Sequence, residues 1–231
     1  MSTPTKTVWI KSAPAGRGPL QHLQADLVDN VLQETEEGLH LGARNIYTDP
    51  GLFDLEVRHI FEGNWVYAAH VSQLPNANDF FSLTIGRQPV VLTRDPDGEI
   101  RAFLNACAHR GARVCRQKSG NKKIHMCAFH GWCYNSRGEL VNVTDQADGA
   151  YPSAFDRSKL GLTPVAEVDV YRGFIFVSLS ADVLPLTDYL AGAAKFIDLI
   201  VDQSPTGELE VLPGETPVSY THLTLPTILR V

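Results

Sequence analysis

The feature that most constrains this chain is a pair of short segments in which a histidine closely follows a cysteine. The first is Cys107-Ala-His109 and the second is Cys127-Ala-Phe-His130. A lone cysteine or histidine is far more often a buried thiol or a surface imidazole than a metal ligand. Two such segments separated by seventeen residues, each with a glycine just after its histidine, do not fit that simple explanation. The pattern predicts a metal site built from two loops.

Two thiolates and two imidazoles are the ligand set of a Rieske-type 2Fe–2S cluster, in which one iron keeps two cysteines and the other takes two histidines. We therefore expect that cluster to bind to Cys107, His109, Cys127 and His130. Neutral histidines in place of anionic thiolates raise the reduction potential above that of an all-cysteine ferredoxin. The glycines that follow, Gly111 and Gly131, would let backbone N–H groups approach the inorganic sulfides.

A tetrahedral zinc site that uses the same four side chains is the main alternative. Structural zinc sites more often use Cys-x2-Cys and His-x3–5-His spacings, and they do not require flanking glycines. The observed spacing therefore favours the cluster. A zinc-stabilised binding module would differ from it in colour and in iron content.

The composition excludes several classes of function. The chain has 231 residues, a formal net charge of −6 and 44% hydrophobic residues, which gives no reason to expect a nucleic acid or an anionic membrane as partner. No apolar run approaches the roughly 18 to 20 residues that span a bilayer. The first six residues have no apolar segment behind them, so we expect no secretory signal. Four cysteines are too few for a disulfide scaffold, and we expect a cytoplasmic location.

Hydrophobic periodicity predicts helices near the N-terminus and strands after them. Apolar residues at helical spacing predict helices over residues 19–31 and 52–61. From residue 65 short β-rich runs predict strands at residues 65–69, 80–85, 89–93, 100–104, 123–127 and 139–143. Turn signals separate them at residues 95–98, 120–121 and 136–138. A further strand at 168–178 and a helix near 190–201 follow. Closely spaced strands of this kind indicate a small antiparallel sandwich or barrel.

The residues around the motif resemble a known family. The block Asn105-Ala-Cys107-Ala-His109-Arg110-Gly111, with Cys127-Ala-Phe-His130-Gly131-Trp132, resembles the large (α) subunit of Rieske non-haem iron ring-hydroxylating dioxygenases. The segments 44–47 and 61–65 are similar to the benzoate, toluate and anthranilate branch, and the resemblance covers roughly residues 1–216. Ala128 replaces the proline that usually follows the third ligand, which removes no ligand.

The resemblance implies an activity and partners. The parent reaction would be the cis-dihydroxylation of an aromatic carboxylate such as benzoate or anthranilate, with O2 and with electrons from NADH. Its partners would be an NADH-dependent flavin/iron–sulfur reductase, a small (β) subunit and further copies in an oligomer. The runner-up hypothesis is a stand-alone Rieske ferredoxin that only carries electrons. Such a ferredoxin needs little beyond the sandwich, whereas this chain has about 40 residues before it and about 50 after it.

Neighbouring residues separate this chain from the Rieske proteins of respiratory bc complexes. Those proteins carry an extra disulfide-bonded cysteine in each ligand loop, where this chain has Ala112 and Ala128. We therefore expect Cys115 and Cys133 to be free buried thiols. The bc type also has a serine two residues after the last ligand, where this chain has Trp132, so the resemblance implies a potential near the low end of the Rieske range.

The remaining histidines show no metal-ligand pairing. We expect His125, in a strand, to face solvent or a neighbouring subunit. Surface or core positions are expected for His22, His40, His59 and His70, and His222 lies in an unusual C-terminal stretch.

The residues after His130 contain no second metal signature. In the family a mononuclear iron, held by two histidines and a carboxylate, activates oxygen. The only later histidine is His222, within residues 217–231, a segment that resembles translated vector sequence. We therefore expect no catalytic residues here and an inactive isolated chain.

The predicted fold is mainly β. It is a Rieske iron–sulfur antiparallel β-sandwich with N-terminal helices and the start of an α+β catalytic domain. Residues 1–40 would form an arm and helix that pack on the catalytic domain. Residues 41–165 would form the Rieske domain, residues 166–216 the incomplete beginning of the catalytic domain, and residues 217–231 a non-native tail.

Overall fold

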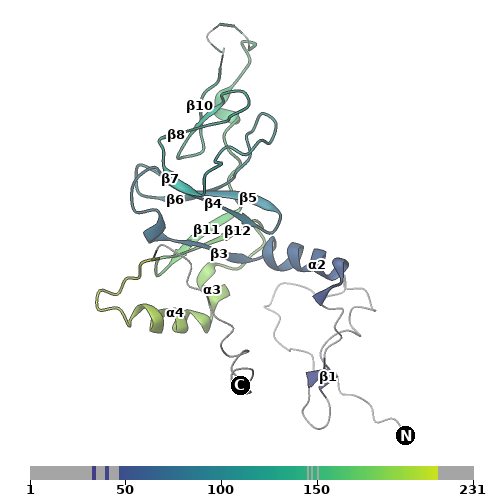
Figure 1. The fold of residues 1–231 in the computed structure, drawn as a ribbon, viewed down its shortest axis with the longest axis vertical. Helices are drawn as coiled ribbons and strands as arrows, with labels where there is room; N and C mark the ends of the chain where they lie inside the picture. Colours follow the sequence, from purple (N-terminus) through teal and green to yellow (C-terminus); the bar gives the residue numbers. More distant parts are fainter. Residues whose placement is uncertain are drawn as a thin grey trace, which may run out of the picture.

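The computed structural model describes residues 33–34, 40–41, 47–144, 146, 148–149 and 151–212. Its strands pair only in the antiparallel sense, and three of its four sheets lie one above another, with helices in the lower part of the described residues (Figure 1). The predicted mainly-β fold is confirmed. The helix predicted over residues 19–31 and the segment 217–231 lie outside the described residues.

The central sheet has the strand order β6-β5-β4-β7. Its strands are β4 (Asp79–Ile85), β5 (Gln88–Arg94), β6 (Ile100–Leu104) and β7 (Ser119–Asn121). Side chains alternate across it, so Phe80 and Phe103 enter one core while Val90 and Leu92 enter another. Both faces of the sheet are therefore covered.

Strand β7 corrects one prediction, because residues 120–121 were expected to form a turn. They pair instead with β4, with Gly120 opposite Phe80. A Cβ atom on Gly120 would lie 3.1 Å from the Phe80 ring. The glycine therefore permits close packing of the ring against the strand.

The second sheet has the order β11-β12-β3 and packs beneath the central sheet. It contains β3 (Trp65–His70), β11 (Glu167–Tyr171) and β12 (Phe174–Ser178). The single strand predicted over residues 168–178 is wrong, because Arg172 and Gly173 turn the chain with φ angles of 49° and 87°. Strands β3 and β12 pair across the predicted domain limit at residue 165.

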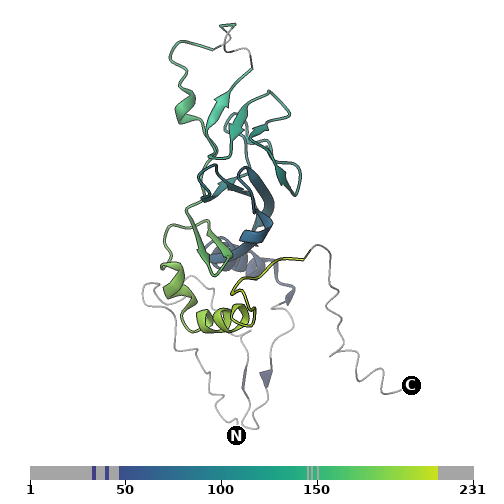
Figure 2. The same cartoon turned by 90° about the vertical axis from the view of Figure 1, so that its left-hand side faces the viewer.

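In the described part of the chain, the helices lie at the lower end, beside and below the sheets (Figure 2). Helix α2 (Pro50–Glu56) begins at Asp49, whose side chain accepts the N–H of Leu52, and it continues as the π-helical turn η2 (Val57–Phe61). The predicted helix over residues 52–61 is thus confirmed. Helices α3 (Leu186–Leu190) and α4 (Ala193–Val201) occupy the region of the predicted C-terminal helix. In the described part of the chain no helix is long and apolar enough to cross a membrane.

The third sheet stands at the upper end and has the order β10-β9-β8 (Figure 1). It consists of β8 (Ile124–Met126), β9 (Cys133–Asn135) and β10 (Leu140–Asn142). We call the described residues within 105–118 and 122–162 the upper lobe. Its core joins Phe80 and Phe103 of the central sheet to buried lobe residues such as Trp132 and Tyr134. The remaining short elements are β1 (Gln33–Glu34), β2 (His40–Leu41), η3 (Val71–Gln73) and η4 (Arg157–Lys159).

Candidate metal centre

Two loops of the upper lobe have the same backbone hydrogen bonds. One follows β6 and the other follows β8. In each, the glycine four residues after the cysteine donates its N–H to the cysteine carbonyl, at 2.7 Å for Gly111 and 3.0 Å for Gly131. Each cysteine N–H donates to the carbonyl of the residue five positions on, at 2.8 Å in both loops. Both glycines have left-handed φ angles, 73° and 68°, which favour glycine.

The two loops bring the four predicted residues together. A single recess is lined by Cys107, His109, Cys127 and His130 with Arg110, Gly111, Ala112 and Phe129. The cysteines are 3% and 2% exposed, whereas His109 is half-buried and His130 is exposed. The two imidazole centroids lie 4.6 Å apart. The sulfurs therefore lie on the inner side and the imidazoles on the outer side.

The His109 ring is held in place but has a free ring nitrogen. It stacks on Trp132, with centroids 5.0 Å apart and planes 12° apart, and the Trp132 Nε1–H donates to Tyr151 Oη at 3.2 Å. His109 Nδ1 is buried without a hydrogen-bond partner. Burial, followed by the nearby His130 and Arg110, lowers the pKa of His109. An oriented, neutral imidazole with an unused nitrogen fits a metal ligand.

Tyr134 is a further residue of the site, which sequence reasoning missed. Its hydroxyl lies 3.1 Å from Cys107 Sγ and accepts the N–H of Ala108, also at 3.1 Å. Burial, then the contact with Cys107, raises the pKa of Tyr134, so the phenol stays protonated. The available signal was its position in the middle of the short strand β9, two residues after the buried Trp132 that precedes the strand.

The other two cysteines lie outside the recess and form no disulfide. Cys115 is buried, as predicted, but Cys133 is only half-buried, with its Sγ 3.2 Å from the carbonyl of Gly131. The prediction that His125 faces solvent or a subunit is wrong, because the side chain is 4% exposed. Its ring packs edge-on against Phe80 and its Nδ1 lies 3.1 Å from Cys115 Sγ.

The remaining histidines are spread through the chain. His70 is buried and its Nδ1 lies 3.0 Å from Ser72 Oγ, whereas His59 is half-buried. His22 and His222 lie outside the described residues, and only the backbone of His40 is described. Among the described residues, no three His, Cys, Asp or Glu side chains surround one point, as a single metal ion would require. A two-iron cluster needs only two protein ligands at each iron.

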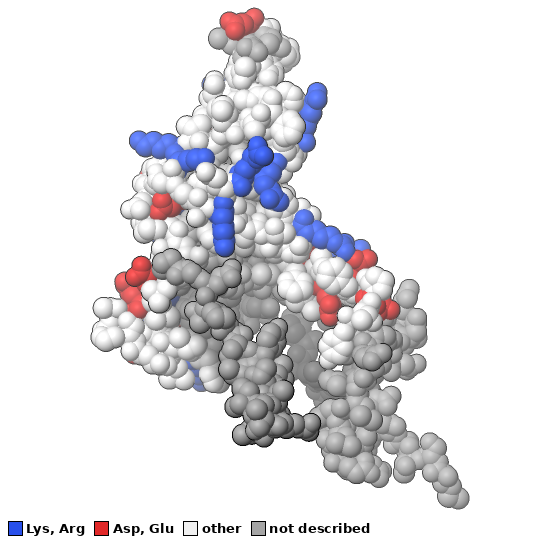
Figure 3. Space-filling view, in the orientation of Figure 1, with Lys and Arg blue, Asp and Glu red and all other residues white. Residues whose placement is uncertain are grey.

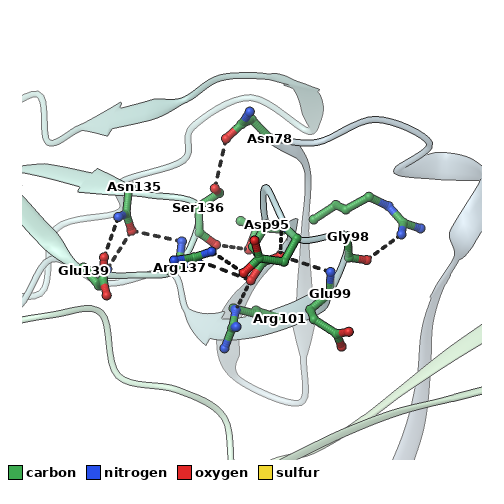
Figure 4. A network of polar contacts seen from close by, with 12 residues as sticks. Asn78, Asp95, Gly98, Glu99, Arg101, Asn135, Ser136, Arg137 and Glu139 are labelled. Carbon is green, nitrogen blue, oxygen red and sulfur yellow. Dashed lines mark hydrogen bonds and ion pairs between the residues drawn. The ribbon is translucent and has the colours of Figure 1, made fainter.

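A buried carboxylate ties the upper lobe to the central sheet (Figure 4). Asp95 is fully buried and accepts the N–H groups of Asp97 and Glu99 and the Nε–H of Arg101, the last at 2.8 Å. Arg137, from the β9–β10 turn, places its Nε 3.5 Å from the same carboxylate. Burial alone would raise the pKa of Asp95, but the bonds from Arg101, Glu99 and Asp97 outweigh it, and the pKa is lowered.

Ser136, which precedes Arg137 in the chain, adds two hydrogen bonds between the upper lobe and residues of the central sheet region. Thr93 Oγ1 donates to the Ser136 carbonyl at 2.6 Å, and Ser136 Oγ donates to Asn78 Oδ1 at 3.0 Å. These hydrogen bonds fix the two candidate ligand loops relative to the central sheet.

Two comparisons identify the class of protein that this lobe defines. Residues 64–165 match the family described as the Rieske [2Fe-2S] domain. The chain is also 36% identical to a naphthalene 1,2-dioxygenase solved with indole in its active site, with a TM-score of 0.70, over 78% of this chain and 39% of that one. The chain therefore contains a Rieske [2Fe–2S] domain.

The curated relatives narrow the family. The chain is 50% identical to the toluate 1,2-dioxygenase α subunit of Pseudomonas putida, over 86% of this chain and 44% of that protein. It is 48% identical to the anthranilate 1,2-dioxygenase large subunit of Acinetobacter baylyi, over 80% of this chain and 39% of that protein. The chain belongs to the family of ring-hydroxylating dioxygenase α subunits, and it spans less than half the length of these relatives.

Proposed function

We propose that Cys107, His109, Cys127 and His130 hold a Rieske 2Fe–2S cluster, and that this chain is the electron-transfer part of a ring-hydroxylating dioxygenase α subunit. The observation that carries the proposal is the recess where two equivalent loops bring these side chains together, with His109 Nδ1 buried and unpaired. The family match to a Rieske [2Fe-2S] domain supports it.

The residues of the lobe would each have a part in holding that group. The two buried cysteines supply thiolates on the inner side, and the two histidines supply neutral imidazoles at the surface. Tyr134 would donate its hydroxyl proton to the Cys107 sulfur, because a ligating thiolate carries no proton and can only accept. Trp132 fixes the plane of the His109 ring. When bound, the cluster supplies reversible one-electron transfer.

The parent activity is part of the same proposal. Relatives named for toluate, anthranilate and 2-halobenzoate favour the O2- and NADH-dependent cis-dihydroxylation of an aromatic carboxylate. Electrons would come from an NADH-dependent flavin/iron–sulfur reductase, and the assembly would include a β subunit and further α subunits in the cytoplasm. We also assign residues 41–165 to the cluster domain and residues 166–216 to the opening of the catalytic domain.

The sequence does not supply a second iron site of the expected kind. A facial triad needs two histidines and a carboxylate, and the only histidine after His130 is His222. We propose that the isolated chain accepts and releases electrons but does not hydroxylate an arene. The test is turnover of benzoate or anthranilate with reductase, NADH and added ferrous iron, measured as diol product. Diol formation by the purified chain would contradict this.

The ligand assignment is tested by metal analysis of chain that has been reconstituted anaerobically. We expect two irons and two labile sulfides per chain and a red-brown colour. Cys107→Ser and Cys127→Ser should abolish the cluster, whereas Cys115→Ser and Cys133→Ser are matched controls that should keep its spectrum, since both lie outside the recess. Stoichiometric zinc without labile sulfide would instead support the zinc-stabilised module.

A further inference from the structure

The basic residues of this chain are concentrated next to the recess. Residues 100–138 contain eight Lys or Arg and no Asp or Glu, although the whole chain has 20 basic and 26 acidic residues. A protein of net charge −6 thus carries an acid-free stretch of 39 residues that includes both candidate ligand loops. Such separation of charge creates a local positive field that attracts an anionic partner.

Six of the eight cations are available to such a partner. Arg101 and Arg137 pair with Asp95. The others are exposed, and among the described residues they form no ion pair: Arg110, Arg113, Arg116, Lys118, Lys122 and Lys123. In Figure 3, basic side chains gather around the central sheet and the lobe above it, whereas acidic ones lie mostly lower down. Unpaired like charges held close together repel one another, which is a cost that an acidic partner removes.

A groove on this surface adds apolar contacts to the charge. Its lining includes Arg116, Lys122, Ile124 and Met126. Ile124 and Met126 are 46% and 63% exposed, whereas His125 between them points inward, as alternation along strand β8 requires. An apolar centre with a charged rim is typical of protein–protein contact surfaces.

We propose that this groove docks an electron-carrier protein domain that presents acidic side chains around an apolar centre. The proposal rests on the electron-transfer function proposed above and names the kind of partner. The groove lies beside the centre, because Met126 immediately precedes the candidate ligand Cys127. Groove and recess share no lining residue, so the groove is distinct from the His109 and His130 edge.

Binding of an acidic plant-type 2Fe–2S ferredoxin to the cluster-loaded chain tests the proposal by calorimetry. The double variant Arg116→Glu and Lys122→Glu should weaken binding at least about tenfold at low salt, because rim charges control association of this kind. The matched control is Arg58→Glu with Lys195→Glu. This control changes the net charge by the same amount as the groove variant. Its two residues are exposed, lie on η2 and α4, and form no ion pair in the described part of the chain. The control should change the Kd less than about threefold, and the difference should shrink near 0.5 M salt.

Hydroxyl-radical footprinting locates the contact independently of affinity. Met126 and Phe129 are 63% and 76% exposed, and one lines the groove while the other lines the recess. The ferredoxin should protect Met126 from oxidation and leave Phe129 reactive. Protection of Phe129 alone would place the carrier on the recess and overturn the proposal.

Other outcomes separate this proposal from the function on which it rests. Equal weakening in the two double variants would show attraction by net charge alone, and unchanged binding in both would exclude the groove. Duplex DNA that binds as tightly as the ferredoxin, and loses affinity in the groove variant, would assign the surface to a nucleic acid. Each of these results overturns the docking proposal. Loss of the 2Fe–2S spectrum from the wild-type chain would instead contradict the proposed function.

Discussion

Tyr134 Oη lies 3.1 Å from Cys107 Sγ and also accepts the N–H of Ala108 at 3.1 Å. A ligating thiolate carries no proton and can only accept, so the hydroxyl would donate its proton to this candidate ligand sulfur. Because reduction adds negative charge to the cluster and its ligands, a hydrogen bond to the sulfur stabilises the reduced state more than the oxidised state.

Removing this hydrogen bond should lower the reduction potential. We expect Tyr134→Phe to lower it by about 60 mV, which is a tenfold change in a one-electron equilibrium constant. Protein-film voltammetry measures the shift. Tyr151→Phe is the matched control, because Tyr151 contacts Trp132 Nε1 and no candidate ligand directly, and its potential should move much less. Equal shifts in both variants would mean that the Tyr134 hydroxyl has no special effect.

Two hairpin glycines should respond differently to the same substitution. Gly98 and Gly138 both have left-handed φ angles, 93° and 75°. A Cβ atom meets nothing within 4 Å at Gly98, but at Gly138 it would overlap Cε1 of the buried Phe103. Gly98→Ala should therefore cost about 1 kcal/mol from the backbone alone, and Gly138→Ala should cost about 2 kcal/mol more because the core is overpacked.

Thermal and urea unfolding of the cluster-loaded variants measure this difference. If Gly138→Ala proved no worse than Gly98→Ala, the Phe103 ring would have to move freely. That result would contradict the tight packing between β6 and the β9–β10 turn.

The recess that brings the four candidate ligands together was predictable from sequence, because each Cys–His pair lies within a short loop. Four residues of two types, cysteine and histidine, predicted the recess by their spacing, and the alternation of apolar residues predicted most strands. The environment of His125 was not predictable. The sequence of a strand shows which side chains share a face of the sheet, but it does not show which of the two faces other parts of the chain bury. Tyr134 was missed for a related reason, because its contact with Cys107 joins residues 27 positions apart.

Continuous apolar sequence also concealed a turn. Residues 174–177 are apolar on both faces, since Ile175 and Val177 pack against the central sheet while Phe176 packs against α3. This apolar run therefore favours the prediction of one long buried strand over residues 168–178. The turn at Arg172 and Gly173 depends on left-handed backbone at a non-glycine residue, which few sequence signals reveal.

Cys115 should be inert towards alkylation in the folded protein. Burial raises the pKa of its thiol to about 12, while the charge of Lys122 only partly opposes this effect. Since the thiolate is the nucleophile, iodoacetamide at pH 7.5 should label Cys115 at least about 100-fold more slowly in the native chain than in urea. Peptide mass spectrometry assigns the label, so the four cysteines are read separately. Rapid native labelling of Cys115 would show that β8 opens readily.

Asp95 should make the free energy of unfolding depend on pH. The Asp95 carboxylate is fully buried and contacts Arg101 and Arg137. The side chain of the nearby Asp97 is 67% exposed and contacts Arg137 but not Arg101. Asp95→Asn should destabilise the chain by about 3 kcal/mol, because it leaves buried donors without a charged acceptor. Asp97→Asn is the matched control and should cost less than about 1 kcal/mol, since an exposed ion pair contributes little.

The sign of the pH effect follows from the lowered pKa of Asp95 in the folded state. Above the unfolded value, near 4, the carboxylate is ionised in both states and the full stabilisation is present. As the pH falls below that value, the unfolded chain takes up a proton first, and stability is lost until the folded carboxyl is protonated too. Urea unfolding between pH 7 and pH 2.5 should therefore show wild type and Asp95→Asn converging at low pH. A constant difference between the two proteins down to pH 2.5 would mean that the ionised carboxylate is not what holds the upper lobe on the central sheet.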